Sequence, residues 1–215
     1  MILTHGANSL KVGETPIPPP AGYQRLKYMY YQYANNSYWL LKNINDLNSD
    51  DRYYIDMDVT TPSDENKTSE IFETNASYGQ SWVGIELTAT TDGYMSFRVA
   101  PASTSSINLN KIAQTGPLNV AFVEPGAVEI NGTRYTKTSA AFTNRYIDDF
   151  LASGTHTRYP EGTKFYEMKI YSSAGVLKHD LVPVINGNNQ LNVCDLVTGL
   201  FSTSLNTNWQ AGPVM

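Results

Sequence analysis

Two carboxylates at alternate positions, Asp56 and Asp58, come nearest in type and spacing to the acid pair of a glycoside hydrolase. Retaining hydrolysis needs two carboxyl groups about 5–5.5 Å apart, one as the acid and one as the nucleophile. Residues two apart on a strand lie roughly 7 Å apart, which is too far for that reaction. No glutamate stands at a suitable spacing from the pair. We therefore predict that Asp56 and Asp58 lie on an exposed strand face and that the protein is not an enzyme.

The histidines and the single cysteine do not form a metal-binding or nucleophile pattern. His5, His156 and His179 lack zinc-ligand spacing. Cys194 lies in an apolar, strand-like run, which predicts a small buried side chain rather than a nucleophile. Calcium is the one cofactor that acidic loops could bind, although such segments are more often solvated turns. The candidate segments are Ser63-Asp64-Glu65-Asn66, Asp148-Asp149 and the set Asp46, Asp50 and Asp51.

The overall composition indicates a β protein that does not bind nucleic acid. Charged residues make up only 16% of the 215 residues, while 15 Tyr, 15 Gly and 11 Pro favour strands and turns. The net charge of −5 is opposite to the basic face that nucleic-acid binding requires. No apolar run is long enough to span a membrane, and no signal peptide pattern opens the chain. We therefore expect synthesis in the cytoplasm without export or membrane insertion.

Short apolar or alternating segments, separated by turn residues, predict about a dozen strands and hence a two-sheet sandwich. Asn131-Gly132 fits a type I′ hairpin turn, and Ser173-Ala174-Gly175 predicts a second reversal. Only residues 146–152 favour a helix or helical turn. The predicted strands cover residues 25–31, 38–41, 53–59, 69–74, 82–88, 94–99, 108–112, 118–124, 127–130, 133–137, 163–171, 176–184 and 191–195.

The chain divides into a short head, a proline-rich spacer and a globular body. Residues 13–21 contain four prolines, which enforce extended geometry and predict a stiff spacer. Residues 22–215 hold all the predicted strands and form the body. Residues 1–12 are too short to bury their apolar side chains alone, so we predict that they anchor the chain to a partner. The anchor residues are Ile2, Leu3, His5, Asn8, Leu10 and Val12.

Residues 162–203 carry a pattern of basic, aromatic and acidic positions that resembles a known family. The segment resembles concanavalin A/laminin-G-like jelly-roll modules of tailed-phage virion proteins. Residues 22–32 and 118–136 resemble the opening and central hairpin of the same modules, so the resemblance covers about residues 22–212. The opening MILTHGANSL is similar to the N-termini of virion fibre or anchor proteins. The matching positions are Lys164, Tyr166, Lys169, Ile170, Tyr171, Val176, Asp180, Leu181, Pro183, Val184, Asp195, Val197, Thr198, Gly199 and Phe201.

This resemblance implies an all-β, antiparallel jelly-roll with an N-terminal anchor arm in a head-fibre, decoration or tail-fibre subunit. Fibre subunits commonly trimerise, so the implied partners are two sister chains, capsid or tail proteins, and host or mucosal glycans. A carbohydrate-active hydrolase and a bacterial glycan-binding protein of the same fold remain the alternatives. Sugars stack on exposed aromatic rings, and most of the aromatic residues must fill the core. The candidates are Tyr28, Tyr30, Tyr31, Tyr33, Tyr38, Trp39, Trp82 and Trp209.

Overall fold

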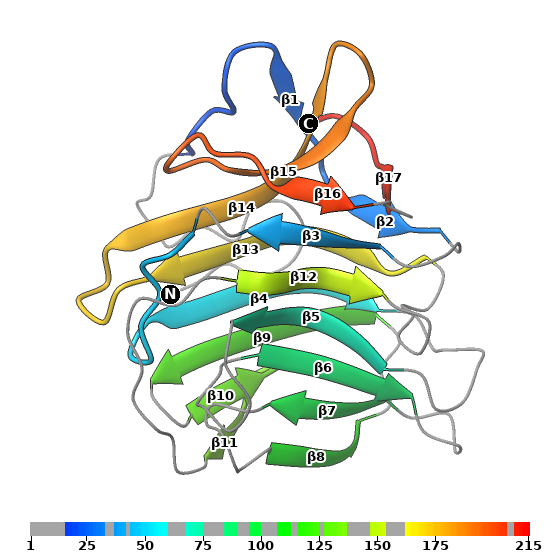
Figure 1. Ribbon diagram of the computed structural model, residues 1–215. Helices are drawn as coiled ribbons and strands as arrows, with labels where there is room; N and C mark the ends of the chain where they lie inside the picture. Colours follow the sequence, from blue (N-terminus) through cyan, green and yellow to red (C-terminus); the bar gives the residue numbers. More distant parts are fainter. Residues whose placement is uncertain are drawn as a thin grey trace.

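The computed structural model shows an all-β protein built from antiparallel strands (Figure 1). The described part of the chain contains seventeen strands and no helix, and thus no helix long and apolar enough to cross a membrane. The prediction of an all-β chain is therefore confirmed at this level. The structure describes residues 16–32, 37–41, 44–59, 68–74, 84–89, 95–99, 107–112, 116–124, 127–136, 147–153, 162–205 and 209–215.

The larger sheet contains ten strands, and its main path has the order β1-β14-β13-β4-β9-β10-β11. Beside this path, β15 pairs with β14, β2 pairs with β13, and β17 pairs with β2. The strands are β1 (Tyr23–Arg25), β2 (Met29–Tyr31), β4 (Arg52–Val59), β9 (Gly116–Glu124), β10 (Ala127–Ile130), β11 (Thr133–Thr136), β13 (Lys164–Tyr171), β14 (Leu177–Asn186), β15 (Leu191–Asp195) and β17 (Trp209–Ala211).

The smaller sheet contains seven strands in the order β16-β3-β12-β5-β6-β7-β8 and lies in front of the larger one in Figure 1. Residues from both sheets form a single hydrophobic core cluster. The rings of Phe150 and Phe165 meet edge to face across it, with centroids 5.3 Å apart. The strands are β3 (Ser37–Leu41), β5 (Thr68–Thr74), β6 (Gly84–Ala89), β7 (Met95–Val99), β8 (Ile107–Ile112), β12 (Ile147–Ser153) and β16 (Thr203–Leu205).

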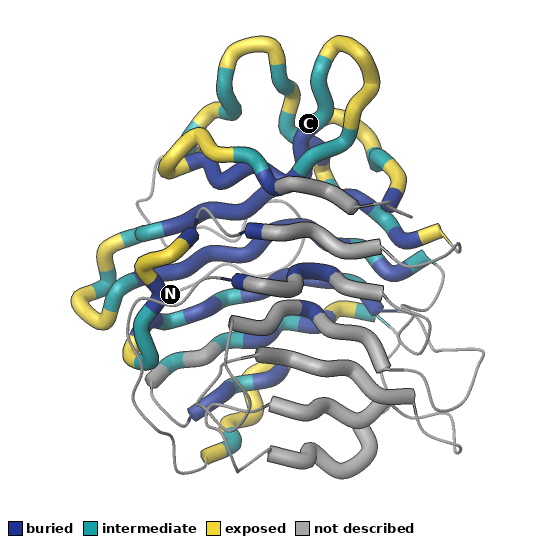
Figure 2. Tube along the Cα trace, in the orientation of Figure 1, coloured by how far each residue is buried: buried dark blue, intermediate teal, exposed yellow. Residues whose placement is uncertain are grey.

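Strand β4 follows the predicted alternation of buried and exposed side chains only in part. Its core-facing side chains, Tyr53, Ile55, Met57 and Val59, are all buried, as their spacing predicts. The opposite face was predicted to be exposed, and for Asp56 this is wrong, since only 2% of the residue is accessible. The strand runs between β13 and β9, whose side chains flank Asp56 on that face. Figure 2 shows mostly buried residues along β13 and the middle of β14, at the centre of the larger sheet.

The helix predicted for residues 146–152 is wrong, because this segment forms strand β12. Its buried side chains, Ile147, Phe150 and Leu151, have the i, i+3, i+4 spacing of a helix face. In the structure, this spacing results from irregular pairing of β12 with its two neighbours, where the register shifts as at a β-bulge. Leu151 also has a positive φ of 49°. Bulges thus interrupt the alternation by which a strand is recognised in sequence.

Three turns adopt the backbone geometry that their sequences predict. Asn131 and Gly132 have φ values of 47° and 81°, as a type I′ turn requires. Gly175 and Gly199 also have positive φ, at 83° and 72°. Strands β16 and β17 were not predicted. The strand predicted for residues 25–31 is divided into β1 and β2.

The described chain begins at Pro16, so the predicted anchor residues and part of the spacer lie outside it. The described spacer residues include Ile17, which is half-buried. Ile17 packs with Tyr23 and Phe201 against a second apolar cluster on β14, β15 and the residue that follows β15. That cluster consists of Val182, Val184, Cys194 and Leu196. The end of the spacer is thus packed onto the body.

Candidate functional site

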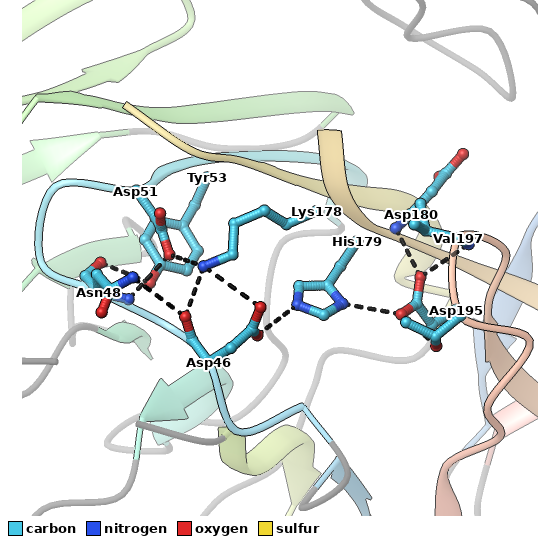
Figure 3. A network of polar contacts seen from close by, with 10 residues as sticks. Asp46, Asn48, Asp51, Tyr53, Lys178, His179, Asp180, Asp195 and Val197 are labelled. Atoms are coloured by element: carbon cyan, nitrogen blue, oxygen red, sulfur yellow. Dashed lines mark hydrogen bonds and ion pairs between the residues drawn. The ribbon is translucent and has the colours of Figure 1, made fainter. Parts of the chain in front are cut away.

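Asp195, at the end of β15, is the centre of a buried polar network (Figure 3). One carboxylate oxygen, Oδ1, accepts the backbone N–H groups of Asp180 and Val197 at 2.9 and 3.1 Å. The other, Oδ2, accepts the Thr198 hydroxyl at 2.7 Å and lies 2.8 Å from Nδ1 of His179. Asp195 is 1% exposed. The carboxylate therefore exchanges its water shell for four protein contacts.

The same residue also fixes the turn that follows β15. Gly199 donates its N–H to the carbonyl oxygen of Asp195 at 2.8 Å, and its positive φ suits a glycine at this position. The N–H of Asp195 in turn donates to the carbonyl oxygen of Leu200 at 2.9 Å. One local set of hydrogen bonds thus joins four of the positions that carry the resemblance, Asp195, Val197, Thr198 and Gly199. We call residues 195–200 with these contacts the Asp195 turn.

His179 joins the Asp195 turn to the segment that connects β3 and β4. Its Nε2 atom lies 2.8 Å from Oδ1 of Asp46, while Nδ1 faces Asp195. A neutral imidazole has only one N–H to donate, so donation to both carboxylates requires the protonated, positively charged ring. His179 is 4% exposed, whereas the Asp46 side chain is 54% exposed. We call this arrangement the Asp46–His179–Asp195 bridge.

The pKa values of the bridge follow from competition between burial and pairing. Burial alone would lower the pKa of His179, but hydrogen bonds and charge from Asp195 and Asp46 raise it overall. For Asp195, burial favours the neutral acid, yet the hydrogen bonds from His179, the Asp180 N–H and Thr198 lower the pKa. Burial would also raise the pKa of Asp46, but its contacts with His179 outweigh this effect, and the pKa is lowered. Asp46 is less buried than Asp195. All three shifts favour the charged form of the bridge.

Lys178 holds the same connecting segment from a neighbouring position. Its Nζ atom lies 2.8 Å from Oδ2 of Asp51 and 3.6 Å from Oδ2 of Asp46. Asp51 is buried, and it also accepts the N–H of Asn48 at 2.8 Å. Burial raises the pKa of Asp51, and the contacts with Lys178 and Asn48 offset this only in part.

These contacts bear on whether the acidic residues of this segment can bind calcium. Protein cations neutralise Asp46 and Asp51, two members of the set considered for calcium together with Asp50. Within the described ranges, no three His, Cys, Asp or Glu side chains come together as a metal site. The structure therefore does not assemble this set as a calcium site.

A second group of charges is buried on the face of the larger sheet that points away from the shared core. Arg25 Nη2 lies 2.7 Å from Oε2 of Glu167, and Lys169 Nζ lies 2.7 Å from Oδ2 of Asp180. Lys169 Nζ is also 3.9 Å from Oε2 of Glu167, which links the two pairs. Glu167, Lys169 and Asp180 are each 2% exposed. We call these four residues the charged layer.

On the same outward face, one row of residues crosses five strands and reaches the surface. The register places these residues side by side across β17, β2, β13, β4 and β9. The ends of the row are exposed, and its middle is half-buried. The row consists of Gln210, Tyr30, Lys164, Asp58 and Pro117, and we call it the outer row.

Aromatic rings pack beside the outer row. Lys164 Nζ lies 5.0 Å from the centroid of the Tyr28 ring, a cation–π arrangement. Tyr28 contacts Tyr30 and Tyr166 edge to face, at centroid distances of 6.4 and 5.7 Å. The Tyr166 hydroxyl donates to Oδ2 of Asp58 at 2.6 Å. The region thus combines aromatic surface with an ammonium group and a carboxylate.

Of the acidic, histidine, cysteine and anchor candidates not yet placed, the structure describes the side chain of Cys194, and the side chains of the rest lie outside the described set. Cys194 is completely buried, and burial raises the pKa of its thiol to about 12, so the predicted buried side chain is confirmed. Asp148 and Asp149 lie on β12, but their side chains fall outside the described set. The anchor residues, His5, His156 and the segment Ser63-Asp64-Glu65-Asn66 also lie outside the described residues.

Sequence reasoning did not identify the charged layer. In KFYEMKIY, Glu167 and Lys169 alternate with the core residues Met168 and Ile170, a pattern typical of a solvated outer face. Nothing in that pattern indicates that the outer face is itself covered. Comparison of the chain with protein-family models, curated proteins and solved structures gave no match.

Proposed function

We propose that this chain is a non-enzymatic structural protein of a phage virion: a head-fibre, decoration or tail-fibre subunit. Its body is a jelly-roll β-sandwich of the concanavalin A/laminin-G-like type, and the resemblance of residues 162–203 supports this assignment. The two antiparallel sheets, which share one core, are compatible with it. A virion protein of this kind is made in the host cytoplasm and assembled into the particle.

The Asp195 turn is the observation that carries the proposal. Its residues include the end of the segment that resembles those modules, and their polar groups bind backbone N–H groups or one another. A side chain that performs chemistry must reach a substrate, whereas Asp195 is 1% exposed. The motif therefore supports a scaffold role rather than a catalytic one.

The N-terminal segment attaches the chain to the particle in this proposal, and the body faces outward. Residues 1–12 provide the anchor, through apolar side chains that bind a capsid or tail protein or two sister chains in a trimer. The packing of Ile17 against the body supports an attachment point that lies before this residue. A deletion for testing the anchor should therefore end at residue 12.

Particle composition tests this assignment directly. Particles purified from a culture that carries the gene should contain the chain when their proteins are identified by mass spectrometry. The chain lacking residues 1–12 should fold with an unchanged melting temperature but should be missing from particles. Recovery of the full chain only in particle-free fractions would contradict the virion assignment. Incorporation of the shortened chain at normal copy number would contradict the anchor.

Adhesion to host or mucosal glycans is the second part of the proposal, and the outer row supports it. Sugar rings stack on aromatic side chains, while carboxylates, amides and ammonium groups bond to their hydroxyls. The outer row and its neighbours offer Tyr30, Lys164, Asp58 and Gln210 in one region. On a glycan array, Tyr30→Ala should weaken binding about tenfold, the effect of losing roughly 1.4 kcal/mol.

A matched surface variant and an activity assay complete this test. Arg134→Ala, on the exposed strand β11, should bind like the unaltered chain. Equal binding by all three proteins would remove the outer row from the proposal. Release of reducing sugar by the purified chain would contradict the non-enzymatic assignment and favour the hydrolase alternative.

A further inference from the structure

Lys169 and Asp180 are positioned for a reaction as well as for an ion pair. They lie directly opposite each other on the paired strands β13 and β14. The nucleophilic Nζ atom of Lys169 lies 2.7 Å from Oδ2 of Asp180. The carboxyl carbon that Nζ would attack is bonded to this oxygen. Both side chains are almost completely buried, at 2–3% exposure. Such proximity converts a bimolecular condensation into an intramolecular step.

A second carboxylate lies beside the reacting pair. Glu167 Oε2 is 3.9 Å from Lys169 Nζ, and Arg25 holds this oxygen at 2.7 Å. The Oδ1 atom of Asp180 is buried and accepts no hydrogen bond from the residues that the structure describes. The Lys169 and Asp180 side chains are almost completely buried, so bulk water has little access and hydrolysis of a newly formed amide is disfavoured. Amine, acid and a fixed proton acceptor are thus assembled in one buried site.

We propose that Lys169 and Asp180 form an intramolecular isopeptide bond, with Glu167 as the proton carrier. One proton first passes from the Lys169 ammonium to the Asp180 carboxylate along their hydrogen bond, which leaves a neutral amine and a neutral acid. The amine nitrogen then attacks the carboxyl carbon of Asp180 and forms the C–N bond. Glu167 takes a proton from this nitrogen and gives it to the departing hydroxyl group. The products are one amide and one water molecule, and no oxidant or other reactant is needed.

The roles of the two carboxylates follow from their surroundings. Arg25 Nη2 holds Oε2 of Glu167 at 2.7 Å, which positions this oxygen beside Lys169 Nζ, where it can carry a proton. Asp180 is the electrophile because its Oδ2 atom is the carboxylate oxygen nearest to Lys169 Nζ, at 2.7 Å against 3.9 Å for Glu167. Its backbone is fixed by the contact of its N–H with Asp195. The bond would join β13 to β14 covalently at the centre of the larger sheet. This inference does not depend on the proposed function.

Intact-mass spectrometry of the full chain tests the bond. The purified protein should be lighter than its sequence mass by one water molecule. Trypsin cleaves after Lys178, and no lysine or arginine follows it, so the linked product should join residues 165–178 to residues 179–215. A chain that keeps its full sequence mass after prolonged incubation would overturn the proposal.

Three variants identify the residues that react. Lys169→Arg keeps the positive charge but provides no suitable amine, so it should keep its full mass. Asp180→Asn should give the same cross-linked mass by releasing ammonia instead of water. Glu167→Gln should slow the reaction by at least about a hundredfold, the usual contribution of general acid–base catalysis.

Folding controls and the contrary outcomes complete the design. Each variant is checked by circular dichroism and thermal melting. A loss of water that persists in Lys169→Arg would place the modification elsewhere and overturn the assignment. Cross-linking at an unchanged rate in a folded Glu167→Gln protein would overturn the role of Glu167.

Discussion

His179 on β14 and Asp195 on β15 face each other at 2.8 Å, with almost no access to solvent. The opposite side of the same imidazole lies 2.8 Å from Asp46, in the segment that leads from the smaller sheet into the larger one. One ring thus connects a turn near the C-terminus to the crossing between the sheets. This contact spans more than a hundred residues of sequence and can form only in the folded chain.

The pH dependence of stability should show the charge on His179. Because the pKa of His179 is raised above 6.5 on folding, its contribution is complete below that pH. The contribution is lost as the pH rises through the folded-state pKa. For Asp195 the pKa is lowered from 3.8, so its contribution is present above that value and is lost as the pH falls through the folded-state pKa. Urea unfolding should therefore give the highest free energy between these two limits.

A substitution of His179 separates its contribution to stability from the contributions of other groups that titrate at alkaline pH. His179→Gln keeps a polar side chain but carries no charge, so the decrease in stability on the alkaline side should become smaller. At pH 6, this variant should be less stable by about 1.5–3 kcal/mol, the range for hydrogen bonds to charged groups. Identical alkaline profiles for the two proteins would show that the ring is not charged in the folded state.

Gly212→Ala should destabilise the protein through a clash with Tyr28. A Cβ atom at this position would clash with the Tyr28 carbonyl oxygen and would lie 2.6 Å from the Tyr28 ring. Because the backbone oxygen cannot rotate away, the cost should be about 2–3 kcal/mol, as for other overpacked sites. The measurement is the midpoint of chemical unfolding. Gly187→Ala is the matched control, since nothing lies within 4 Å of the added atom. Equal midpoints for the two variants would contradict this packing.

Removal of residues 190–215 should prevent soluble folding. This deletion takes away β15, β16 and β17 and exposes the edge of β14. It also removes Trp209, which is 2% exposed and packs on Tyr31 with centroids 5.6 Å apart. The expected loss is several kcal/mol from a total stability of about 5–15 kcal/mol. Soluble yield and the cooperativity of thermal melting provide the measurement. A cooperative transition at the original temperature would contradict a single core.

Most of the strands could be predicted because their side chains alternate between core and solvent. The hairpin at Asn131-Gly132 was also predictable, since few dipeptides accept two positive φ values. Strand β12 was not, because its bulges give the buried residues a helical spacing. Strands β16 and β17 have only three residues each, which is too short to show any period. Strand prediction from this sequence therefore fails where bulges disturb the alternation and where a strand is very short.

The polar network could be predicted less well than the fold. The family-like pattern identified Asp180, Asp195 and Thr198 as important positions, and the turn at Gly199 followed from local chemistry. The bridge from Asp195 through His179 to Asp46 joins the paired strands β14 and β15 to a segment more than 100 residues earlier in the chain, and nothing in local spacing specifies that contact. The charged layer was missed for a related reason: alternation shows which face a side chain occupies but not whether that face is covered.

A double-mutant cycle on His179 and Asp195 tests most directly whether the C-terminal motif serves to hold the fold together. The free energy of unfolding is measured at pH 6 for the unaltered chain, His179→Ala, Asp195→Asn and the double variant. Asparagine keeps an oxygen for the turn but removes the charge that faces the ring. We predict a coupling energy above about 1 kcal/mol, because contacting charged groups are not additive. Effects that add to within about 0.5 kcal/mol would show that the two residues do not stabilise each other, which would contradict this account.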